Sequence, residues 1–325
     1  MAAAGRSPDA GLAEIASTLA PAADRPARPG PLEVQTLDHL LVDRARAREV
    51  PVRLHLPAGE GPCPVIVFSH GLGGSRLGYG WLGRSWASFG YAVLHPTHPG
   101  SDTSLLRGSG LVPFRNLRAA MADPANWEAR ARDVSFLLDQ LPALEQALPR
   151  LAGRLDASLV GVGGHSFGGY TAAALAGAQL WFPGEESPRP LADPRPLAFL
   201  AMSPPGYGER GLRPGSWSTI ARPLFEITGT LDFGAFDGSP YELRLAPFAD
   251  LPPGGKTLLV VDGADHLSFA GGTSSSPARE AQKALVEEAT LAFWDGWLLG
   301  RAGALDRLTR EALAVHGIGV RIEQR

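Results

Sequence analysis

Short apolar runs alternate with amphipathic stretches along most of the chain. Six of these runs, each four to six residues long, lack the regular polar positions of a half-exposed strand. Runs of this kind predict strands that are covered on both faces, as in a parallel sheet with helices between successive strands. The predicted strands are Pro64–Phe68, Tyr91–Leu94, Leu159–Val162, Leu197–Met202, Leu224–Thr228 and Thr257–Val261.

One early segment has a different pattern. In Val50–Leu56 apolar and polar residues alternate, which predicts a strand with one exposed face. Pro51 has no backbone N–H, so we expect this strand to lie at an edge of the sheet, antiparallel to its neighbour.

Three stretches predict helices. Trp127–Leu141 carries an apolar stripe at spacings of three and four, Tyr170–Leu180 is rich in alanine, and Ala278–Leu299 is long and amphipathic. Ser101–Asn126 and Pro183–Pro196 fit neither pattern. Long connections often surround a substrate site, and the sequence leaves open whether either forms a lid. The stripe consists of Trp127, Ala131, Val134, Leu138 and Leu141.

The pattern as a whole predicts an α/β fold with one catalytic domain. Residues 1–30, rich in Ala, Pro and Arg, are expected to form a flexible leader, and residues 31–325 a single domain. Nothing resembling a linker separates two apolar cores, so we expect no large separate cap domain.

Composition narrows the class of protein. The 325 residues are 44% hydrophobic, and 33 acidic residues nearly balance 30 basic ones, giving a net charge of −3. This composition excludes a disordered chain, and it lacks the positive charge expected of a nucleic-acid-binding protein. The single cysteine, Cys63, excludes an intramolecular disulfide and a metal site built from several thiolates.

The sequence also bears on location in the cell. No apolar run reaches the roughly 20 residues of a transmembrane helix. The N-terminus lacks the basic and then apolar pattern of a signal peptide. We therefore expect a cytoplasmic protein without a membrane span; an exported protein whose signal had been removed would show the same pattern.

The strongest chemical signal is Gly164-His165-Ser166-Phe167-Gly168, a G-x-S-x-G pentapeptide that is followed by Gly169. A predicted strand precedes it and a helix of small residues follows it. A serine on such a tight turn is exposed above the sheet, and glycine on both sides removes the clash that larger residues would cause. Ser166 is therefore the candidate nucleophile, and a serine that only caps the helix is the alternative.

A serine nucleophile needs a base, and the base needs an acid that orients it. In a fold of this type the order along the chain is serine, acid, histidine, with the acid and the histidine after later strands. His266 follows the run that ends at Val261, and Asp232 follows the run that ends at Thr228. These two residues are therefore the candidate base and acid.

Other histidines and carboxylates fit this order less well. Six of the eight histidines precede Ser166, and His316 lies near the C-terminus. Asp237 is the rival acid in the segment GAFDGSP, whereas Asp262 and Asp265 are too close to His266 in sequence for the usual geometry.

Attack on a carbonyl also requires donors for the oxyanion. One backbone N–H comes from the residue after the nucleophile, Phe167, and the other from a loop after an earlier strand. The segment Phe68-Ser-His-Gly-Leu72-Gly-Gly is such a loop, and Leu72 is the candidate second donor. A phosphate-binding loop is the weaker interpretation, because the chain lacks the G-x-x-x-x-G-K-[ST] motif there.

Together these residues resemble the α/β-hydrolase superfamily, and more narrowly the bacterial dienelactone-hydrolase-like and platelet-activating-factor-acetylhydrolase-like serine esterases. The similarity spans roughly residues 36–300 and rests on VIVFSHGLGGSR, the segment from Gly90 to Ser101, Arg132-Asp133 and GHSFGG. The resemblance implies an eight-stranded, mostly parallel sheet with helices on both faces, a mechanism without metal or cofactor, and hydrolysis of acyl esters.

Two departures limit what the resemblance implies about the substrate. Dienelactone hydrolases carry a cysteine at the nucleophile position of this turn, where this chain has Ser166. In platelet-activating-factor acetylhydrolases the acid follows the strand after the nucleophile helix, whereas here that strand is followed by Ser203 and no carboxylate. The position of Asp232 is similar to that in cutinase-like and general carboxylesterases.

We therefore expect a serine carboxylic-ester hydrolase that forms an acyl-enzyme on small to medium acyl esters, with a small-molecule or lipid-like ester as partner. Lactone, polyester or phospholipid-type ester hydrolysis, acyl transfer, peptide hydrolysis and a catalytically silent binding protein remain alternatives. The candidate pocket residues are Leu72, Phe167, Leu105–Phe114, Trp217 and Phe233–Phe236.

Overall fold

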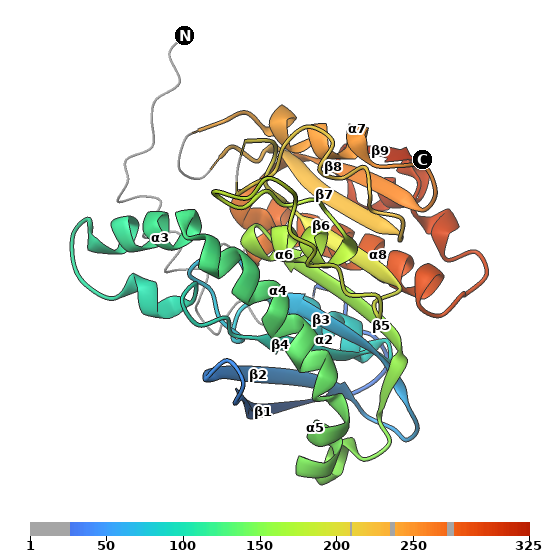
Figure 1. The fold of residues 1–325 in the computed structure, drawn as a ribbon. Helices are drawn as coiled ribbons and strands as arrows, with labels where there is room; N and C mark the ends of the chain where they lie inside the picture. Colours follow the sequence, from blue (N-terminus) through green and yellow to red (C-terminus); the bar gives the residue numbers. More distant parts are fainter. Residues whose placement is uncertain (1–26, 209, 235–237, 272–275) are drawn as a thin grey trace.

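A single twisted sheet forms the centre of the molecule, with strands in the order β1-β2-β4-β3-β5-β6-β7-β8-β9 (Figure 1). This is seen in a computed structural model that describes residues 27–208, 210–234, 238–271 and 276–325. The strands are β1 (Val34–Asp43), β2 (Arg48–Pro57), β3 (Cys63–Ser69), β4 (Ala92–Pro96), β5 (Leu155–His165), β6 (Ala198–Met202), β7 (Leu224–Leu231), β8 (Lys256–Asp265) and β9 (Val320–Gln324).

The six apolar runs form the middle of this sheet, as predicted. From β4 through β8 all neighbouring strands are parallel, whereas β1, β2 and β9 are joined by antiparallel pairing. The expectation of a mostly parallel α/β sheet is therefore confirmed.

Two expectations about the edges of the sheet were wrong. The sheet in the described part of the chain has nine strands rather than eight, because β9 adds an antiparallel strand beside β8. The alternating strand at Val50–Leu56 is not an edge strand either: it belongs to β2, which lies between β1 and β4. Pro51 still takes part in the pairing of β2 through its carbonyl, which accepts a hydrogen bond from the N–H of Thr97 at 2.7 Å.

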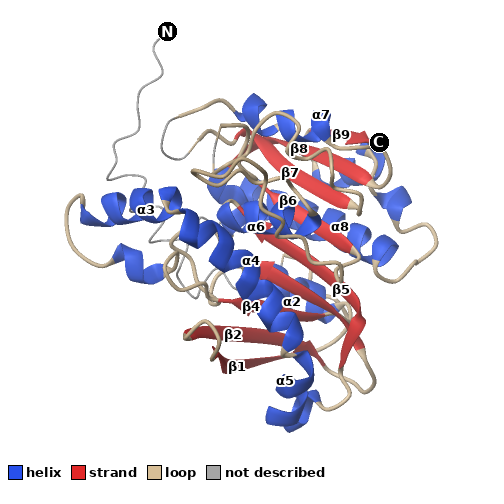
Figure 2. Ribbon diagram, in the orientation of Figure 1, coloured by secondary structure: helices blue, strands red, loops and turns tan. Residues whose placement is uncertain are grey.

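Helices cover both faces of the sheet (Figure 2). None of those in the described residues has the length and apolar composition needed to cross a bilayer. The helices are α2 (Gly80–Ser88), α3 (Val112–Ala122), α4 (Pro124–Asp139), α5 (Leu141–Ala147), α6 (Phe167–Ala176), α7 (Ala246–Asp250), α8 (Pro277–Trp297) and α9 (Arg310–Leu313), with short 3-10 turns that include η2 (Thr103–Leu106) and η5 (His266–Ala270).

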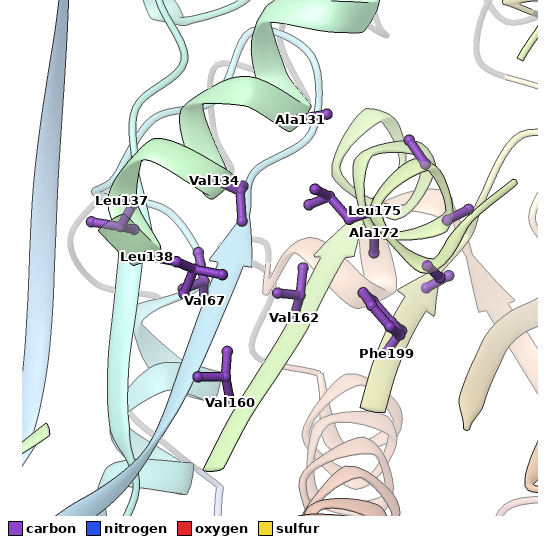
Figure 3. Close-up of a cluster of buried hydrophobic side chains, with 14 of the residues drawn as sticks. Val67, Ala131, Val134, Leu137, Leu138, Val160, Val162, Ala172, Leu175 and Phe199 are labelled. Atoms are coloured by element: carbon purple, nitrogen blue, oxygen red, sulfur yellow. The ribbon is translucent and has the colours of Figure 1, made fainter. Parts of the chain in front are cut away.

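One face of the sheet packs against α4, α5 and α6. The predicted stripe is buried, with four members in α4 and Leu141 at the start of α5. Its α4 members pack with valines of β3 and β5 and the small residues of α6 (Figure 3). The labelled members of this cluster are Val67, Ala131, Val134, Leu137, Leu138, Val160, Val162, Ala172, Leu175 and Phe199.

The opposite face packs against α2 and α8. Trp81 and Trp86 of α2 and Trp294 of α8 are buried there, and the indole N–H of Trp86 donates to Thr290 Oγ1 at 3.0 Å. Burial of these large side chains on both faces removes the sheet from water and is the main source of its stability.

The last residues of the expected leader contact α2 and α8. Residues 1–26 lie outside the described part of the chain. The backbone N–H groups of Ala27 and Arg28 donate to the carboxylate of Glu287 in α8, both at 2.9 Å, and that of Gly30 donates to Ser88 Oγ at 2.7 Å.

The long connection at Ser101–Asn126 contains η2, α3 and the first turn of α4. It touches the loop after β3: the N–H of Gly73 donates to the Ser101 carbonyl at 2.9 Å, and Leu106 and Leu117 lie beside Gly73. Pro183–Pro196 contains no helix or strand, apart from an isolated bridge between Leu180 and Arg189. The parallel strands all end at the same edge of the sheet, where the candidate site residues lie.

Candidate active site

Ser166 lies on a sharp turn between β5, which ends at His165, and α6, which begins at Phe167. Its backbone has φ 56° and ψ −115°, a conformation that L-residues rarely adopt. A Cβ atom on Gly164 would lie 2.3 Å from the backbone of Gly168, and one on Gly168 would lie 1.9 Å from the Ser69 carbonyl oxygen. Only glycine therefore fits at both flanks of Ser166.

The other two candidate residues reach Ser166 from the ends of later strands. His266 follows β8, and its Nε2 atom lies 2.9 Å from Ser166 Oγ. Its Nδ1 atom lies 2.8 Å from Oδ1 of Asp232, which follows β7. A carboxylate can only accept, so Nδ1 carries the proton and Nε2 is free to accept the proton of the serine hydroxyl.

Asp232 is fully buried and its carboxylate has further partners. Thr228 Oγ1 donates to Oδ2 at 2.8 Å, and Nε of Arg244 lies 3.1 Å from Oδ1. Burial alone would raise the pKa of Asp232, but the adjacent His266 and Arg244 hold it well below its usual range. The carboxylate therefore stays charged and keeps the His266 ring in one orientation.

The described alternative carboxylates near His266 do not contact its ring. Oδ1 of Asp265 accepts the backbone N–H of Ser268 at 2.8 Å and caps η5, and the same carboxylate pairs with Arg279 at 2.9 Å. Asp262 is exposed beside β9, and its N–H donates to the Gly319 carbonyl. Asp237 lies outside the described residues. Among the described carboxylates, Asp232 is the partner of the His266 ring.

The loop after β3 holds the peptide between Gly71 and Leu72 in one orientation. The Gly71 carbonyl accepts from His70 Nδ1 at 2.6 Å and from the Gly74 N–H at 3.1 Å. His70 must donate through Nδ1, because its Nε2 accepts the N–H of His98 at 3.1 Å. In a trans peptide the N–H points opposite to the carbonyl, so the Leu72 N–H is directed away from these donors.

Neither candidate oxyanion donor has an acceptor within the described part of the chain. The Leu72 N–H lies in a loop, and the Phe167 N–H is at the first position of α6, where a helix leaves its amides without internal partners. The two segments are adjacent, since a Cβ on Gly71 would lie 3.5 Å from the His165 carbonyl. Two free amides beside a helix N-terminus favour negative charge.

A buried arginine lies beneath this loop. The guanidinium of Arg130 donates to the His70 carbonyl, to Ser101 Oγ at 2.7 Å and to Thr171 Oγ1 at 3.1 Å, and it stacks 4.6 Å from the centre of the Phe167 ring. Burial lowers the pKa of Arg130 to about 9, so the group remains charged at neutral pH.

A second Ser–His–Asp chain lies in the same region. Ser69 Oγ lies 3.1 Å from His98 Nε2, and His98 Nδ1 lies 3.0 Å from Asp133 Oδ2. All three side chains are buried, and Asp133 also binds Arg48 at 2.7 Å. Ser69 is completely buried, so a substrate cannot reach it, whereas Ser166 is partly exposed. The second chain instead links the ends of β3 and β4 to α4.

Sequence reasoning did not identify Arg130 or the supporting roles of His70 and His98. A signal for Arg130 is nevertheless present, because it is three residues after Trp127 and four before Val134, on the apolar stripe of α4. A charge on a buried stripe requires polar partners in the fold. The histidines carry no comparable local signal.

The candidate pocket residues fall into two groups. Trp217 and Phe167 are both buried in the core, so the expectation that their side chains line an open pocket was wrong. Of the other candidates, Phe233 is about half exposed, and so are Leu231 and Leu243, which were not among the residues predicted from the sequence. Leu111 and Val112 at the start of α3 are also exposed, and residues 235 and 236 lie outside the described part of the chain.

Comparison with known families agrees with the fold. The family model of platelet-activating factor acetylhydrolase, isoform II, matches residues 39–106. This segment includes His70, Leu72 and His98 and ends before Ser166. No curated protein matches the chain. The resemblance to this family is therefore confirmed over that segment, and with it the α/β-hydrolase fold; the match also supports hydrolysis of ester bonds.

Proposed function

We propose that the protein is a serine carboxylic-ester hydrolase in which Ser166 is the nucleophile, His266 the base and Asp232 the acid. The observation that carries the proposal is the position of His266, whose two ring nitrogens lie within 2.9 Å of Ser166 Oγ and 2.8 Å of Asp232 Oδ1. This geometry fits proton transfer from the serine as it attacks a carbonyl.

In the first half of the proposed reaction Ser166 Oγ bonds to the ester carbonyl carbon while its proton moves to His266 Nε2. The Leu72 and Phe167 N–H groups donate to the oxyanion that forms, and Asp232 stabilises the imidazolium. Collapse of this intermediate breaks the bond to the alkoxy group, which takes the proton from Nε2 and leaves as an alcohol.

The second half of the reaction returns the enzyme to its starting state. Water loses a proton to His266 Nε2 and attacks the acyl carbon bound to Ser166. The same two N–H groups hold the second oxyanion. Breakage of the bond to Ser166 Oγ then releases the carboxylic acid, and Oγ regains its proton from Nε2.

We further propose that the substrate is a lipid-like ester. Leu231 and Phe233 flank the acid residue and are each 49% exposed, which favours an apolar acyl or alcohol group beside the site. The match to platelet-activating factor acetylhydrolase supports the same class. The position of Asp232 after β7 rather than after β6 favours a simple carboxylic ester as the second candidate.

The test is hydrolysis of p-nitrophenyl acetate, butyrate and octanoate by the wild type and by Ser166→Ala. The expected loss of kcat is on the order of 10⁴–10⁶ if the three residues act as a unit. Ser218→Ala, which removes an exposed serine hydroxyl elsewhere, is the matched control and should keep full activity. Equal slow rates in wild type and Ser166→Ala would overturn the proposal and favour a binding protein.

Substrate class is tested with the same two proteins. A glycerophospholipid with a short sn-2 acyl chain should be hydrolysed by the wild type and not by Ser166→Ala. Hydrolysis of p-nitrophenyl esters without hydrolysis of the phospholipid would leave a general esterase. Adding a competing alcohol distinguishes acyl transfer, because the product is then a new ester rather than the free acid.

A further inference from the structure

One chain of hydrogen bonds connects the three segments that carry the proposed machinery. The N–H of Gly71, beside Leu72, is 3.3 Å from the hydroxyl of Tyr79. That hydroxyl is 2.7 Å from Nδ1 of His165, the residue before Ser166. Nε2 of His165 is 2.9 Å from the backbone carbonyl of His266.

The direction of every proton in this chain follows from its two ends. The Gly71 N–H can only donate, so the Tyr79 oxygen accepts there and its own O–H donates onward to His165 Nδ1. The His266 carbonyl can only accept, so His165 Nε2 carries the proton. His165 is therefore a neutral imidazole of a single tautomer, with each nitrogen in use.

Burial keeps this arrangement in place. Tyr79 and His165 are almost completely buried, and burial lowers the pKa of His165 well below its usual value. The rings of Tyr79 and His165 lie 5.6 Å apart, and those of His165 and His266 lie 4.7 Å apart. A charged or rotated His165 would leave buried polar groups without partners.

Tyr79 adopts an unusual backbone conformation to take part. Its φ is 60° and its ψ 18°, in the left-handed region that residues with large side chains rarely occupy. The residue begins α2 without capping it through its side chain, because the phenol points to His165 instead. Strain of this kind persists where surrounding contacts maintain it, often near functional sites.

We propose that His165 and Tyr79 are positioning residues for the reaction, a role that rests on the proposed function. His165 holds the backbone of His266 and so sets where the His266 ring points. Tyr79 fixes the tautomer of His165. Its hydroxyl also accepts the Gly71 N–H, which links His165 to the loop after β3 that carries Leu72 (the oxyanion loop). The base and the oxyanion donors are thereby held in register with Ser166.

Two substitutions at His165 separate the two halves of this role. In His165→Gln the amide nitrogen reaches the position of Nε2 and still donates to the His266 carbonyl, but the bond to Tyr79 is lost. In His165→Asn the amide oxygen occupies the position of Nδ1 and still accepts from Tyr79, but the bond to His266 is lost. Tyr79→Phe removes the hydroxyl. Tyr91→Phe is its control: Tyr91, just before β4, also loses a buried hydroxyl, one that donates to Asp295 at 2.8 Å.

The readout is kcat and KM for p-nitrophenyl butyrate, normalised to the amount of enzyme that an irreversible fluorophosphonate labels. We expect kcat of His165→Asn to fall by about 10–100-fold with KM within about twofold, because a misplaced base affects the chemical step. His165→Gln should keep most of kcat, Tyr79→Phe should lose about 10-fold, and Tyr91→Phe should be unchanged.

Unchanged kcat in labelled His165→Asn and Tyr79→Phe would overturn the inference while leaving the proposed function intact. A merely structural role would lower the labelled fraction and the melting temperature with kcat per labelled site unchanged, and that outcome would also overturn it. If the wild type fails the Ser166→Ala test, the proposed function fails instead.

An independent measurement does not require activity. Nuclear magnetic resonance of ¹⁵N-labelled histidine should show a neutral His165 protonated at Nε2 in the wild type, assigned with His165→Gln. The proton between His266 Nδ1 and Asp232 should shift in His165→Asn and not in Tyr91→Phe. A proton on Nδ1 of His165, or an unaffected His266 signal, would contradict the inference.

Discussion

Gly168 lies so close to Ser69 that a Cβ atom added to it would stand 1.9 Å from the Ser69 carbonyl oxygen. This contact joins the turn that carries Ser166 to the end of β3, from which the oxyanion loop continues. The distance between the nucleophile and the Leu72 N–H therefore depends on the absence of a side chain at residue 168.

Gly168→Ala should force these two segments apart. Because the clashing atoms belong to the backbone, the shift cannot be absorbed by a side chain, and we expect a loss of kcat on the order of 10²-fold. Gly78→Ala is the control, since its Cβ would meet nothing closer than the Ser75 carbonyl at 3.6 Å. Full activity of Gly168→Ala against p-nitrophenyl butyrate would show that the contact is not limiting.

Substitution of His70 should weaken the oxyanion donor without touching the nucleophile. His70→Leu removes the donor that holds the Gly71 carbonyl, so the Leu72 N–H loses its fixed direction, and kcat should fall by about 10–100-fold. In His70→Asn an amide nitrogen near the position of Nδ1 still donates, and much of kcat should return. The decisive comparison is affinity for a boronic acid that mimics the oxyanion: equal affinity for wild type and His70→Leu would contradict this role.

Asp232→Asn should lose activity through the wrong tautomer of His266. The carboxylate accepts the Nδ1 proton, whereas an amide presents a donor as readily as an acceptor, and the expected loss of kcat is on the order of 10⁴-fold. Asp262→Asn changes an exposed carboxylate only four residues before His266 and should retain activity. If the two variants behaved alike, Asp232 would not be the acid.

Stability should depend on pH through Glu226. This residue lies within β7, is 1% exposed, and neither carboxylate oxygen has a hydrogen-bond partner among the described residues. Burial raises its pKa from 4.5 to about 8. The folded state therefore favours the protonated form. Keeping Glu226 protonated costs folding free energy only where the unfolded chain would ionise it: this cost is absent below pH 4.5, grows as the pH rises to about 8, and then stays constant.

Replacing Glu226 with leucine removes that cost. The melting temperature of Glu226→Leu relative to wild type should be higher at pH 9 than at pH 5 by on the order of 5 °C. Thermal unfolding followed by circular dichroism measures this difference. Glu60→Leu, at an exposed position, should show no such dependence. The same shift at both pH values for Glu226→Leu would mean that Glu226 is not held protonated.

Short stretches of the sequence predict the central strands and the candidate catalytic residues. Each central strand contains a short, mostly apolar run. The turn that carries the nucleophile is recognisable because the conformation of Ser166 requires Gly164 and Gly168 within a few residues. The order of Ser166, Asp232 and His266 after successive strands follows from the rule that parallel strands end at one edge of a sheet. The structure brings these three residues together; their roles await the experiments above.

The edge strands of the sheet are harder to predict from the sequence. In β1 most side chains are exposed or half-exposed, and β9 has only five residues, so neither has the apolar pattern that marks the central strands. Their pairing with β2 and β8 stabilises them instead. Because β1 lacks an apolar pattern, the sequence alone predicts β2 as the edge strand.

Only the tertiary structure decided what surrounds the candidate site. Arg130, Tyr79 and His165 have hydrogen-bond partners up to 101 residues away in sequence, and the hydrogen bonds of His70 depend on the backbone of His98. Nothing in local composition specifies such pairs, because the same histidine can be a base, a donor or a buried acceptor. Its role is set by the atoms that the fold places within about 3 Å of each ring nitrogen.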